Sequence, residues 1–402
     1  MLDAYIYDGL RSPIGRHAGK LAGLRPDDLA ADVIKEVVAR NKLDPVEISD
    51  VVLGCVNQAG EDNRNVARFA ALLAGLPATT PGCTVNRLCA SGLQAVVDAS
   101  RAITCGEGEL YIAGGVESMS RAPYVMSKPD VPYGRDAKMY DTTIGTRFPN
   151  AKFIKQYGNQ SMPETGDNVA KDYGITREQS DEFALASQQK YATAEKEGFY
   201  AGEIMPVTLP AKKKDAPGEQ VKADEHPRRD STMEALAKLK PLFEGGVVTA
   251  GNASGVNDGA AALIIGNRKW GERKGRKPLA RIRAAASAGV EPRIMGVGPA
   301  YAIPRALERA GLKLAEMDII EINEAFASQV LGCLKLMNVD FKDPRVNPNG
   351  GAIAIGHPLG ASGARLALTV AREMQQSGAR YAAVSLCIGV GQGLAVILER
   401  VQ

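Results

Sequence analysis

The first 120 residues of the chain alternate between two hydrophobic periods. Short apolar runs at residues 4–8, 48–55 and 109–113 predict buried strands. Between them, apolar residues recur at helical spacing over residues 29–38 and 64–76, which predicts helices. Strands that alternate with helices are typical of α/β domains, so we expect an α/β fold.

A polar segment interrupts this alternation of strand and helix patterns from about residue 121 to about residue 248. It is rich in loops, prolines and charges, and one clear helix begins at Thr176, where Gln179 completes a capping box. Two of its loops, at residues 211–215 and 224–229, lean basic. Such loops are usually solvated surface, and the alternative is an insertion that covers a site and meets an anionic ligand.

The last third of the chain repeats the first. Residues 28–43 match 298–312, and Leu-Cys-Ala-Ser-Gly at 88–92 matches Leu-Gly-Ala-Ser-Gly at 359–363, all at an offset of about 270 residues. An ordered series of such matches predicts two homologous α/β halves related by a pseudo-twofold axis. Because ligands of open α/β sheets lie beyond the carboxyl ends of the strands, the two Ala-Ser-Gly helices should begin close together at the shared interface.

The repeat predicts how the chain is divided. Residues 1–120 together with 249–270 form the first half, 271–402 form the second, and 121–248 form an inserted loop domain. A length of 402 residues suits two or three domains.

Composition narrows the class of protein. The net charge of +3 and the aromatic content of 5% give no reason to expect nucleic-acid binding. We see no signal peptide and no run of about 18 apolar residues that would predict a membrane span. The six cysteines lack Cys-x-x-Cys pairs and the three histidines lack ligand spacing, which favours a cytoplasmic protein with free thiols and no metal site.

One cysteine stands at a position suited to nucleophilic chemistry. Cys89 lies between an extended stretch at 81–84 and a helical run at 93–100. Near a helix N-terminus, unpaired backbone N–H groups and the helix dipole favour a thiolate, and the thiolate is a nucleophile that needs no metal. The alternative is a small buried hydrophobe, the usual state of an intracellular cysteine.

Four more stretches carry candidate chemistry. His357, flanked by glycines, either acts as acid or base beside a cysteine or merely holds its loop. Cys387 ends a strand at a glycine turn suited to an oxyanion hole, although a buried cysteine is the favoured interpretation of this stretch alone. Asn323, within residues 321–326, either orients a water or an oxyanion or caps the next helix. Residues 249–259 line a narrow channel or form a tight turn.

Taken in order, these stretches resemble the motifs of the thiolase family, and the resemblance covers essentially the whole chain. It implies the duplicated five-layered α/β/α/β/α thiolase fold, with a loop domain inserted in the N-terminal half. The motifs are Cys-Ala-Ser-Gly at 89–92, Gly-Gly-Val-Glu-Ser-Met-Ser at 114–120, Gly-Asn-Ala-Ser-Gly at 251–255, Asn-Glu-Ala-Phe at 323–326, Gly-His-Pro at 356–358 and Cys-Ile-Gly at 387–389.

The resemblance also implies catalytic roles. Cys89 matches the nucleophile that is acylated, and His357 matches the residue that activates it and hydrogen-bonds the thioester oxygen. Cys387 matches the acid and base that acts on the α-carbon of acetyl-CoA, and Asn323 matches the residue that holds an oxyanion-hole water. The N–H groups of Cys89 and Gly389 would form a second oxyanion hole, in an acyltransferase with ping-pong kinetics.

Coenzyme A is, by the same resemblance, a substrate and not a permanently bound cofactor. We expect contacts along its pantetheine chain and contacts near its nucleotide end or channel. The residues matched to the pantetheine are Ser254, Ala325 and Phe326, those matched to the nucleotide end or channel are Arg228, Phe243 and Met162, and Ala250 completes the set.

Departures from the family pattern indicate a narrower group. Ser161-Met162 stands where acetoacetyl-CoA thiolases have a His-Met pair, and Val390 replaces a glycine. Residues 57–63, 141–145, 161–165 and 387–392 resemble thiolases of aromatic-compound degradation, so we expect cleavage of 3-oxoadipyl-CoA to succinyl-CoA and acetyl-CoA by a homodimer or homotetramer. The alternatives are an acetoacetyl-CoA or general 3-ketoacyl-CoA thiolase, a ketosynthase, and a non-catalytic acyl-CoA-binding relative. An arginine or lysine of the inserted segment is the candidate to hold the distal carboxylate.

Overall fold

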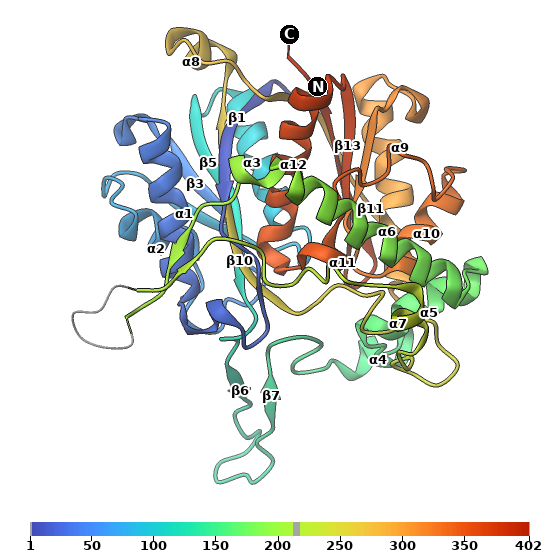
Figure 1. The fold of residues 1–402 in the computed structure, drawn as a ribbon. Coiled ribbons are helices and arrows are strands. Elements are labelled where there is room, and N and C mark those ends of the chain that lie inside the picture. Colours follow the sequence, from blue (N-terminus) through green and yellow to red (C-terminus); the bar gives the residue numbers. More distant parts are fainter. Residues whose placement is uncertain (1, 212–217, 402) are drawn as a thin grey trace.

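A computed structural model describes residues 2–211 and 218–401 of the chain (Figure 1). Most of the basic stretch at 211–215 falls outside these ranges. Within them, one continuous sheet of ten strands runs through the molecule. In spatial order its strands are β12 (Ile319–Ile322), β13 (Tyr381–Ile388), β14 (Gln392–Glu399), β11 (Ala280–Gly289), β1 (Ala4–Arg11), β10 (Asn257–Gly266), β5 (Leu110–Ser118), β3 (Asp50–Gly54) and β4 (Gly82–Val85), and β2 (Gly15–Arg16) pairs with β10.

The sheet has the same strand order on both sides of its centre. The two halves meet where β1 pairs antiparallel with β11, with Tyr5 opposite Arg281. From this junction outward, each half has two antiparallel pairs followed by a parallel pair. Strand β4 forms the edge of the first half, and the equivalent place in the second holds a single parallel bridge between Ile320 and Val346. The internal repeat of the sequence is therefore a repeat of topology.

Helices cover both faces of the sheet, and two of them lie between its halves (Figure 1). Helices α3 and α12 pack against strands of both halves and share one apolar core with them. A second core joins α1 and α2 to the outer face of the first half, and a third joins α9 and α10 to the outer face of the second. These five layers are the expected α/β/α/β/α arrangement. The bounds are α1 (Pro26–Arg40), α2 (Val66–Leu73), α3 (Ser91–Cys105), α8 (Arg268–Arg273), α9 (Gly298–Ala310), α10 (Ala327–Leu336), α11 (Ala352–Ile355) and α12 (Leu359–Ser377).

The central helices touch backbone to backbone where they begin. A Cβ added to Gly92 of α3 would lie 2.5 Å from the carbonyl oxygen of Gly360 in α12, and one added to Gly363 would overlap the backbone of Leu93. Only glycine allows such an approach. The two Ala-Ser-Gly helices therefore begin side by side, as the sequence predicts, and they bring loops from both halves together.

The inserted segment is fastened to the first strand by a buried ionic cluster. Arg11 of β1 donates from Nε to Glu203 at 2.6 Å and from Nη1 to Asp224 at 2.6 Å, and all three side chains are fully buried. Helix α6 begins with the expected capping box between Thr176 and Gln179. The segment contains β6 (Tyr124–Met126), β7 (Met139–Asp141), α4 (Ala151–Tyr157), α5 (Met162–Tyr173), α6 (Arg177–Lys196), β8 (Val207–Thr208), β9 (Gln220–Val221) and α7 (Met233–Ala237).

No helix in the described ranges is both long and apolar enough to cross a membrane. The same ranges hold no group of three or more His, Cys, Asp or Glu side chains placed to bind a metal ion.

Candidate active site

Cys89 is presented by a tight turn that ends β4 and leads into α3. Ser91 closes this turn: its hydroxyl accepts from the N–H of Arg87 at 2.8 Å and donates to the carbonyl of Leu88 at 2.6 Å. Leu88 has a φ of 47°, in the left-handed region that side chains other than glycine rarely adopt. The turn therefore holds Cys89 in a defined position just before the helix starts at Ser91.

The thiol of Cys89 keeps its proton, contrary to the prediction from the helix N-terminus. Burial raises the pKa of Cys89 to about 11, and the backbone N–H groups of Gly389 and Cys89, which face the sulfur, lower it only in part. The helix begins two residues later, so desolvation outweighs the favourable dipoles. For this sulfur to act as a nucleophile, a partner must first take its proton.

His357 is held by two side chains, one from β10 and one from α12. Its backbone N–H donates to Oδ1 of Asn257 at 2.9 Å, and its Nδ1 lies 2.6 Å from the hydroxyl of Ser362. That hydroxyl donates to the carbonyl of Pro358 at 2.9 Å, so it accepts from Nδ1–H of the imidazole. Nε2 is then the unprotonated nitrogen, which is the tautomer a base requires.

The imidazole of His357 is neutral. Burial lowers the pKa of His357 to about 3, and the positive charge of Arg365 lowers it further. A neutral imidazole can accept a proton at Nε2, because the base form is fully populated at neutral pH.

Asn323 stands next to His357 with one atom unpaired. Its backbone N–H donates to the carbonyl of Ser385 at 2.9 Å, and its Nδ2 lies 3.4 Å from Nε2 of His357. Its Oδ1 is buried and has no hydrogen-bond partner within the described part of the chain. A buried carbonyl oxygen of this kind favours a donor such as a water molecule.

Cys387 is buried in a small apolar cluster at the end of β13. The cluster contains Val248, Met295, Ala325 and Phe326, and Met162 packs against it from α5. Burial raises the pKa of the Cys387 thiol well above its ordinary value, and the nearby Cys89 raises it further. Cys387 is thus a neutral acid close to Cys89.

The largest opening at this site is a cavity of about 490 Å³ beside Cys89. Gly389 lies in its wall, and a Cβ added there would be 3.8 Å from Sδ of Met162. The lining residues come from segments 56–57, 88–89, 117–119, 142–147, 159–164 and 389–390, together with Leu359. Within the wall, Val390 adopts a φ of 65°, an unusual conformation for a β-branched residue, and its side chain is 54% exposed.

The residues matched to coenzyme A divide between two places. Arg228 and Ala250 line a separate hollow of about 200 Å³, with His226 beside them. Ser254 donates its N–H to the carbonyl of Ala325 at 2.9 Å, which ties it to the apolar cluster around Cys387. Phe243 is 41% exposed and lines neither opening.

Two residues that position the candidate catalytic loops and His357 were not among the sequence predictions: Glu117 and Ser362. Glu117, buried in the cavity wall, accepts from the N–H groups of Val56, Asn57 and Gly360 at 2.9–3.0 Å and so joins the two halves. Burial raises the pKa of Glu117 to about 7. Ser362 holds His357, and the Ala-Ser-Gly repeat was the signal that could have found it.

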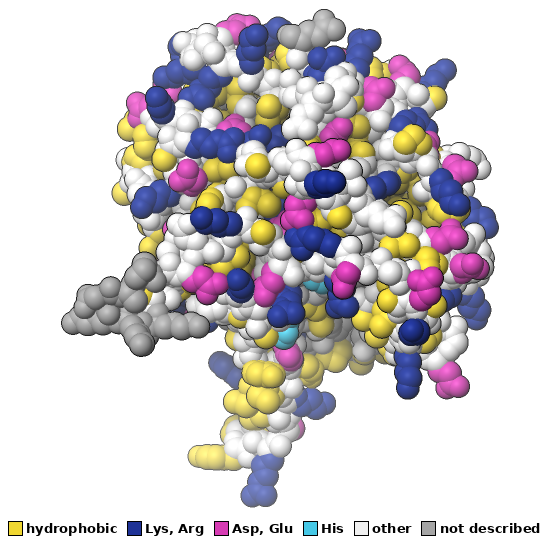
Figure 2. All heavy atoms as spheres, viewed as in Figure 1, with side chains coloured by type: hydrophobic (Ala, Val, Ile, Leu, Met, Phe, Trp, Pro, Cys, Tyr) yellow, Lys and Arg dark blue, Asp and Glu magenta, His cyan; other side chains and the backbone are white. Residues whose placement is uncertain are grey.

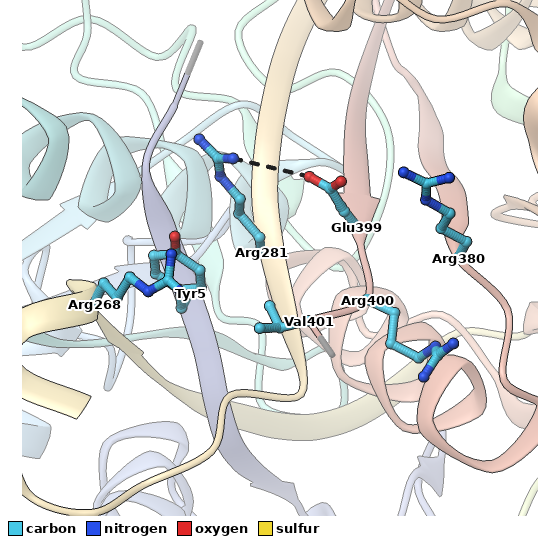
Figure 3. Close-up of a pocket in the computed structure, with 7 residues that line it drawn as sticks. All are labelled: Tyr5, Arg268, Arg281, Arg380, Glu399, Arg400 and Val401. Carbon is cyan, nitrogen blue, oxygen red and sulfur yellow. Dashed lines mark ion pairs between the residues drawn. The ribbon is translucent and has the colours of Figure 1, made fainter. Parts of the chain in front are cut away.

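A second, basic pocket lies at the opposite end of the strands. It has a volume of about 290 Å³, and its lining includes Glu399 and four arginines, of which Arg281 of β11 pairs with Glu399 (Figure 3). Arg380 precedes β13, whereas Cys387 is near the end of that strand, so roughly 25 Å of strand separates the two places. This pocket is not part of the site around Cys89.

Comparison with known proteins places this geometry in one family. Residues 4–269 match the family model described as "Thiolase, N-terminal domain", and residues 276–400 match "Thiolase, C-terminal domain". The chain is 57% identical over 403 residues to the 3-oxoadipyl-CoA/3-oxo-5,6-dehydrosuberyl-CoA thiolase of Escherichia coli, with 100% of both chains covered.

Two further comparisons agree. The chain is 56% identical to the beta-ketoadipyl-CoA thiolase of Pseudomonas aeruginosa, with 99% of each chain covered. The crystal structure of the Bacillus anthracis acetyl-CoA acetyltransferase superposes with a TM-score of 0.91 at 39% identity, and the match covers 100% of this chain and 99% of that one. The chain therefore belongs to the thiolase family and is an acyltransferase that uses coenzyme A as a substrate.

Proposed function

We propose that this thiolase cleaves 3-oxoadipyl-CoA with coenzyme A to give succinyl-CoA and acetyl-CoA. One observation carries the proposal: the stretches that set the sequence apart from acetoacetyl-CoA thiolases line the cavity beside Cys89. They contribute Asn57, residues 142–145, Ser161-Met162 and Val390 to its wall. The substrate names printed for relatives at 56–57% identity support it.

The first half-reaction begins with Cys89. Nε2 of His357 takes the thiol proton, and the sulfur attacks the 3-oxo carbon of the substrate. The bond between the α-carbon and that carbonyl carbon then breaks, and its electron pair leaves on the α-carbon as the enolate of acetyl-CoA. Cys387 gives its proton to this carbon, acetyl-CoA departs, and a succinyl group remains on Cys89.

The second half-reaction transfers the acyl group. Cys387 recovers a proton from the incoming coenzyme A thiol, and the resulting thiolate attacks the carbonyl of succinyl-Cys89. The bond to Cys89 breaks, its sulfur regains the proton from His357, and succinyl-CoA leaves. His357 and Cys387 thus account for every proton transferred to or from the Cys89 and coenzyme A thiols. Because acetyl-CoA leaves before coenzyme A reacts, the kinetics are ping-pong.

Two sets of donors suit the developing negative charges. The N–H groups of Cys89 and Gly389 face the sulfur of Cys89 and would stabilise the oxyanion formed by attack on the carbonyl. Nε2 of His357, once protonated, together with a water on the unpaired Oδ1 of Asn323, would stabilise the enolate oxygen.

For coenzyme A we propose an approach from the side of the inserted segment. Ser254, Ala325 and Phe326 would contact the pantetheine, and Met162 lies where this channel meets the acyl cavity. Arg228 and Ala250 would lie near the nucleotide end, because the hollow that they line carries a positive side chain suited to phosphate. Phe243, exposed on the surface, would cover the nucleotide.

We also propose that the three parts of the chain have different roles in catalysis and binding. The first half, residues 1–120 with 249–270, supplies Cys89, and the second half, 271–402, supplies Asn323, His357 and Cys387. The inserted loop domain, 121–248, would bind coenzyme A and shape the acyl cavity.

The protein is further proposed to act as a homodimer or homotetramer in the cytoplasm. Among the residues that the structure describes, no strand pairs with the outer edge of β4, and next to it Phe69, Leu72 and Leu73 of α2 are exposed. The β6–β7 hairpin projects from the body and carries hydrophobic side chains (Figures 1 and 2). All six cysteines are free, which suits a reducing compartment. Light scattering of the purified protein tests the assembly, and a monomer would contradict it.

A direct test compares substrates. We expect kcat/KM for thiolysis of 3-oxoadipyl-CoA to exceed that for acetoacetyl-CoA by at least about tenfold, since a distal carboxylate would add a charge-assisted contact. Equal or better turnover of acetoacetyl-CoA would favour the second candidate, an acetoacetyl-CoA thiolase, which the Bacillus anthracis relative supports.

A further inference from the structure

The cavity beside Cys89 has an apolar wall and one positive side chain. Its apolar residues include Val56, Leu88 and Leu359. Arg147 is the only Lys or Arg among the described residues that line it. An acyl chain of methylene groups fits such a wall, but a carboxylate at the end of that chain would be costly to bury without a cation.

Arg147 is not neutralised by the protein. Its guanidinium has no carboxylate within 4.0 Å in the described part of the chain. The two acids of the cavity wall already have partners: Glu117 accepts from three backbone N–H groups, and Glu164 caps α5 through Ser161 at 2.6 and 2.7 Å. Both acids therefore have hydrogen-bond donors of their own, and the guanidinium of Arg147 is left, within the described ranges, without an ion-pair partner and available to a ligand.

The loop that carries Arg147 is anchored to the body. Thr142 is buried, donates its hydroxyl to the carbonyl of Pro123 at 2.6 Å and accepts from Nδ2 of Asn57 at 3.1 Å. Arg147 itself is partly buried and close enough to the buried Asp62 for its charge to lower the pKa of that carboxyl, against the effect of burial. The loop is thus tied to the body at Thr142, and Arg147 follows five residues later in the cavity wall.

The chemistry of the proposed reaction sets where a carboxylate must lie. Attack of Cys89 on the 3-oxo carbon leaves a succinyl group on the sulfur, whose carboxylate is two methylene groups beyond the thioester carbonyl. The residues matched to coenzyme A, other than Met162, do not line this cavity, so the succinyl group is the part of the substrate that enters it. Arg147 is the cation available there.

We propose that Arg147 binds the distal carboxylate of the acyl group and makes the enzyme selective for 3-oxoacyl-CoA substrates that end in a carboxylate. This assignment rests on the proposed function. A planar guanidinium suits the role because it can donate two parallel hydrogen bonds to one carboxylate. The polar side chains of Thr143, Asn159 and Gln160 line the same cavity and can donate further hydrogen bonds to the carboxylate.

The test compares two substrates of equal chain length, 3-oxoadipyl-CoA and 3-oxohexanoyl-CoA, in which a methyl group replaces the carboxylate. We expect Arg147→Gln to lower kcat/KM for 3-oxoadipyl-CoA by roughly 10- to 100-fold and to leave the value for 3-oxohexanoyl-CoA within about twofold. Arg147→Lys should keep part of the preference, because lysine retains the charge without the planar fork. Arg135→Gln, on an exposed arginine of the same inserted segment, is the matched control and should change neither value.

A second measurement changes the substrate as well as the protein. The monomethyl ester of 3-oxoadipyl-CoA should lose on the wild-type enzyme about as much kcat/KM as Arg147→Gln loses on the acid, and the two losses should not add. An equal loss on both substrates, or no loss on 3-oxoadipyl-CoA, would overturn the role of Arg147. If wild-type enzyme does not prefer 3-oxoadipyl-CoA over 3-oxohexanoyl-CoA, the proposed function itself fails, and it fails before any variant is compared.

Discussion

The beginnings of α3 and α12 share the Ala-Ser-Gly sequence and lie side by side, but their chemistry differs. Both helices start with Ala-Ser-Gly, and the glycine of each touches the other helix. In the first half the residue before this run is Cys89, which faces the cavity. In the second half it is Gly360, where an added Cβ would overlap the carbonyl oxygen of Val116, so no side chain fits there. The contact between the halves thus leaves room for a side chain at this position on one side only.

The serines of the two runs show the same division. Ser91 closes the turn that presents Cys89, and its equivalent Ser362 accepts from the imidazole of His357. One local motif therefore holds the proposed nucleophile in one half and the proposed base in the other. The site is a composite that neither half contains alone.

The largest expected effect comes from replacing Cys89 with glycine, the residue at the equivalent position 360 of the second half. Cys89→Gly should lower thiolysis by at least about 10³-fold, because the acyl group loses its covalent carrier, while the fold is retained. Steady-state thiolysis and circular dichroism measure the two effects. Cys83→Ala, on an exposed cysteine of the adjacent strand, is the control, and activity that survives Cys89→Gly would refute the nucleophile.

The reverse change tests the close contact between the helices. Gly360→Ala should destabilise the protein by about 1–3 kcal/mol, since the new methyl group meets the backbone of β5 and cannot be accommodated by a flexible side chain. Urea unfolding of this variant is compared with that of Gly23→Ala, where an added methyl group meets open space. Equal midpoints for the two variants would show that the contact is looser than described.

A smaller effect is expected at the serines. Ser362→Ala removes the acceptor of Nδ1–H and should lower kcat by roughly tenfold, because a misoriented or misprotonated imidazole is a weaker base. Ser91→Ala should instead cost about 1 kcal/mol of stability through the loss of its turn hydrogen bonds. The comparison fails if both variants lose activity and stability to the same extent.

The pH dependence of Cys89 alkylation gives the smallest but most diagnostic signal. Because burial raises the pKa of Cys89 to about 11, the thiolate fraction, and with it the rate of inactivation by iodoacetamide, should rise steadily between pH 7 and pH 9. A resting thiolate–imidazolium pair would instead give a rate that is already level near pH 7. That result would contradict the neutral pair of Cys89 and His357.

Much of the frame could be predicted from the sequence, because the repeat and the apolar periods are local signals. They predicted the two halves and the close start of α3 and α12. The protonation of Cys89 could not be predicted, because it depends on burial by segments far apart in the chain. The hydrogen bond that positions His357 could not be predicted either, because its partner Asn257 is 100 residues away in the sequence. Arg147 carries no signal in its own loop and stands out only where the folded cavity shows which charges are already paired.

The central claim is that one acyl group is carried on Cys89 of the first half while His357 and Cys387 of the second half move the protons. Mixing the enzyme with 3-oxoadipyl-CoA in the absence of free coenzyme A, followed by peptide mass spectrometry, tests this most directly. The account predicts a succinyl adduct on the peptide that contains Cys89 and none on the peptide that contains Cys387. Release of acetyl-CoA with Cys89 unmodified, or an adduct on Cys387, would contradict it.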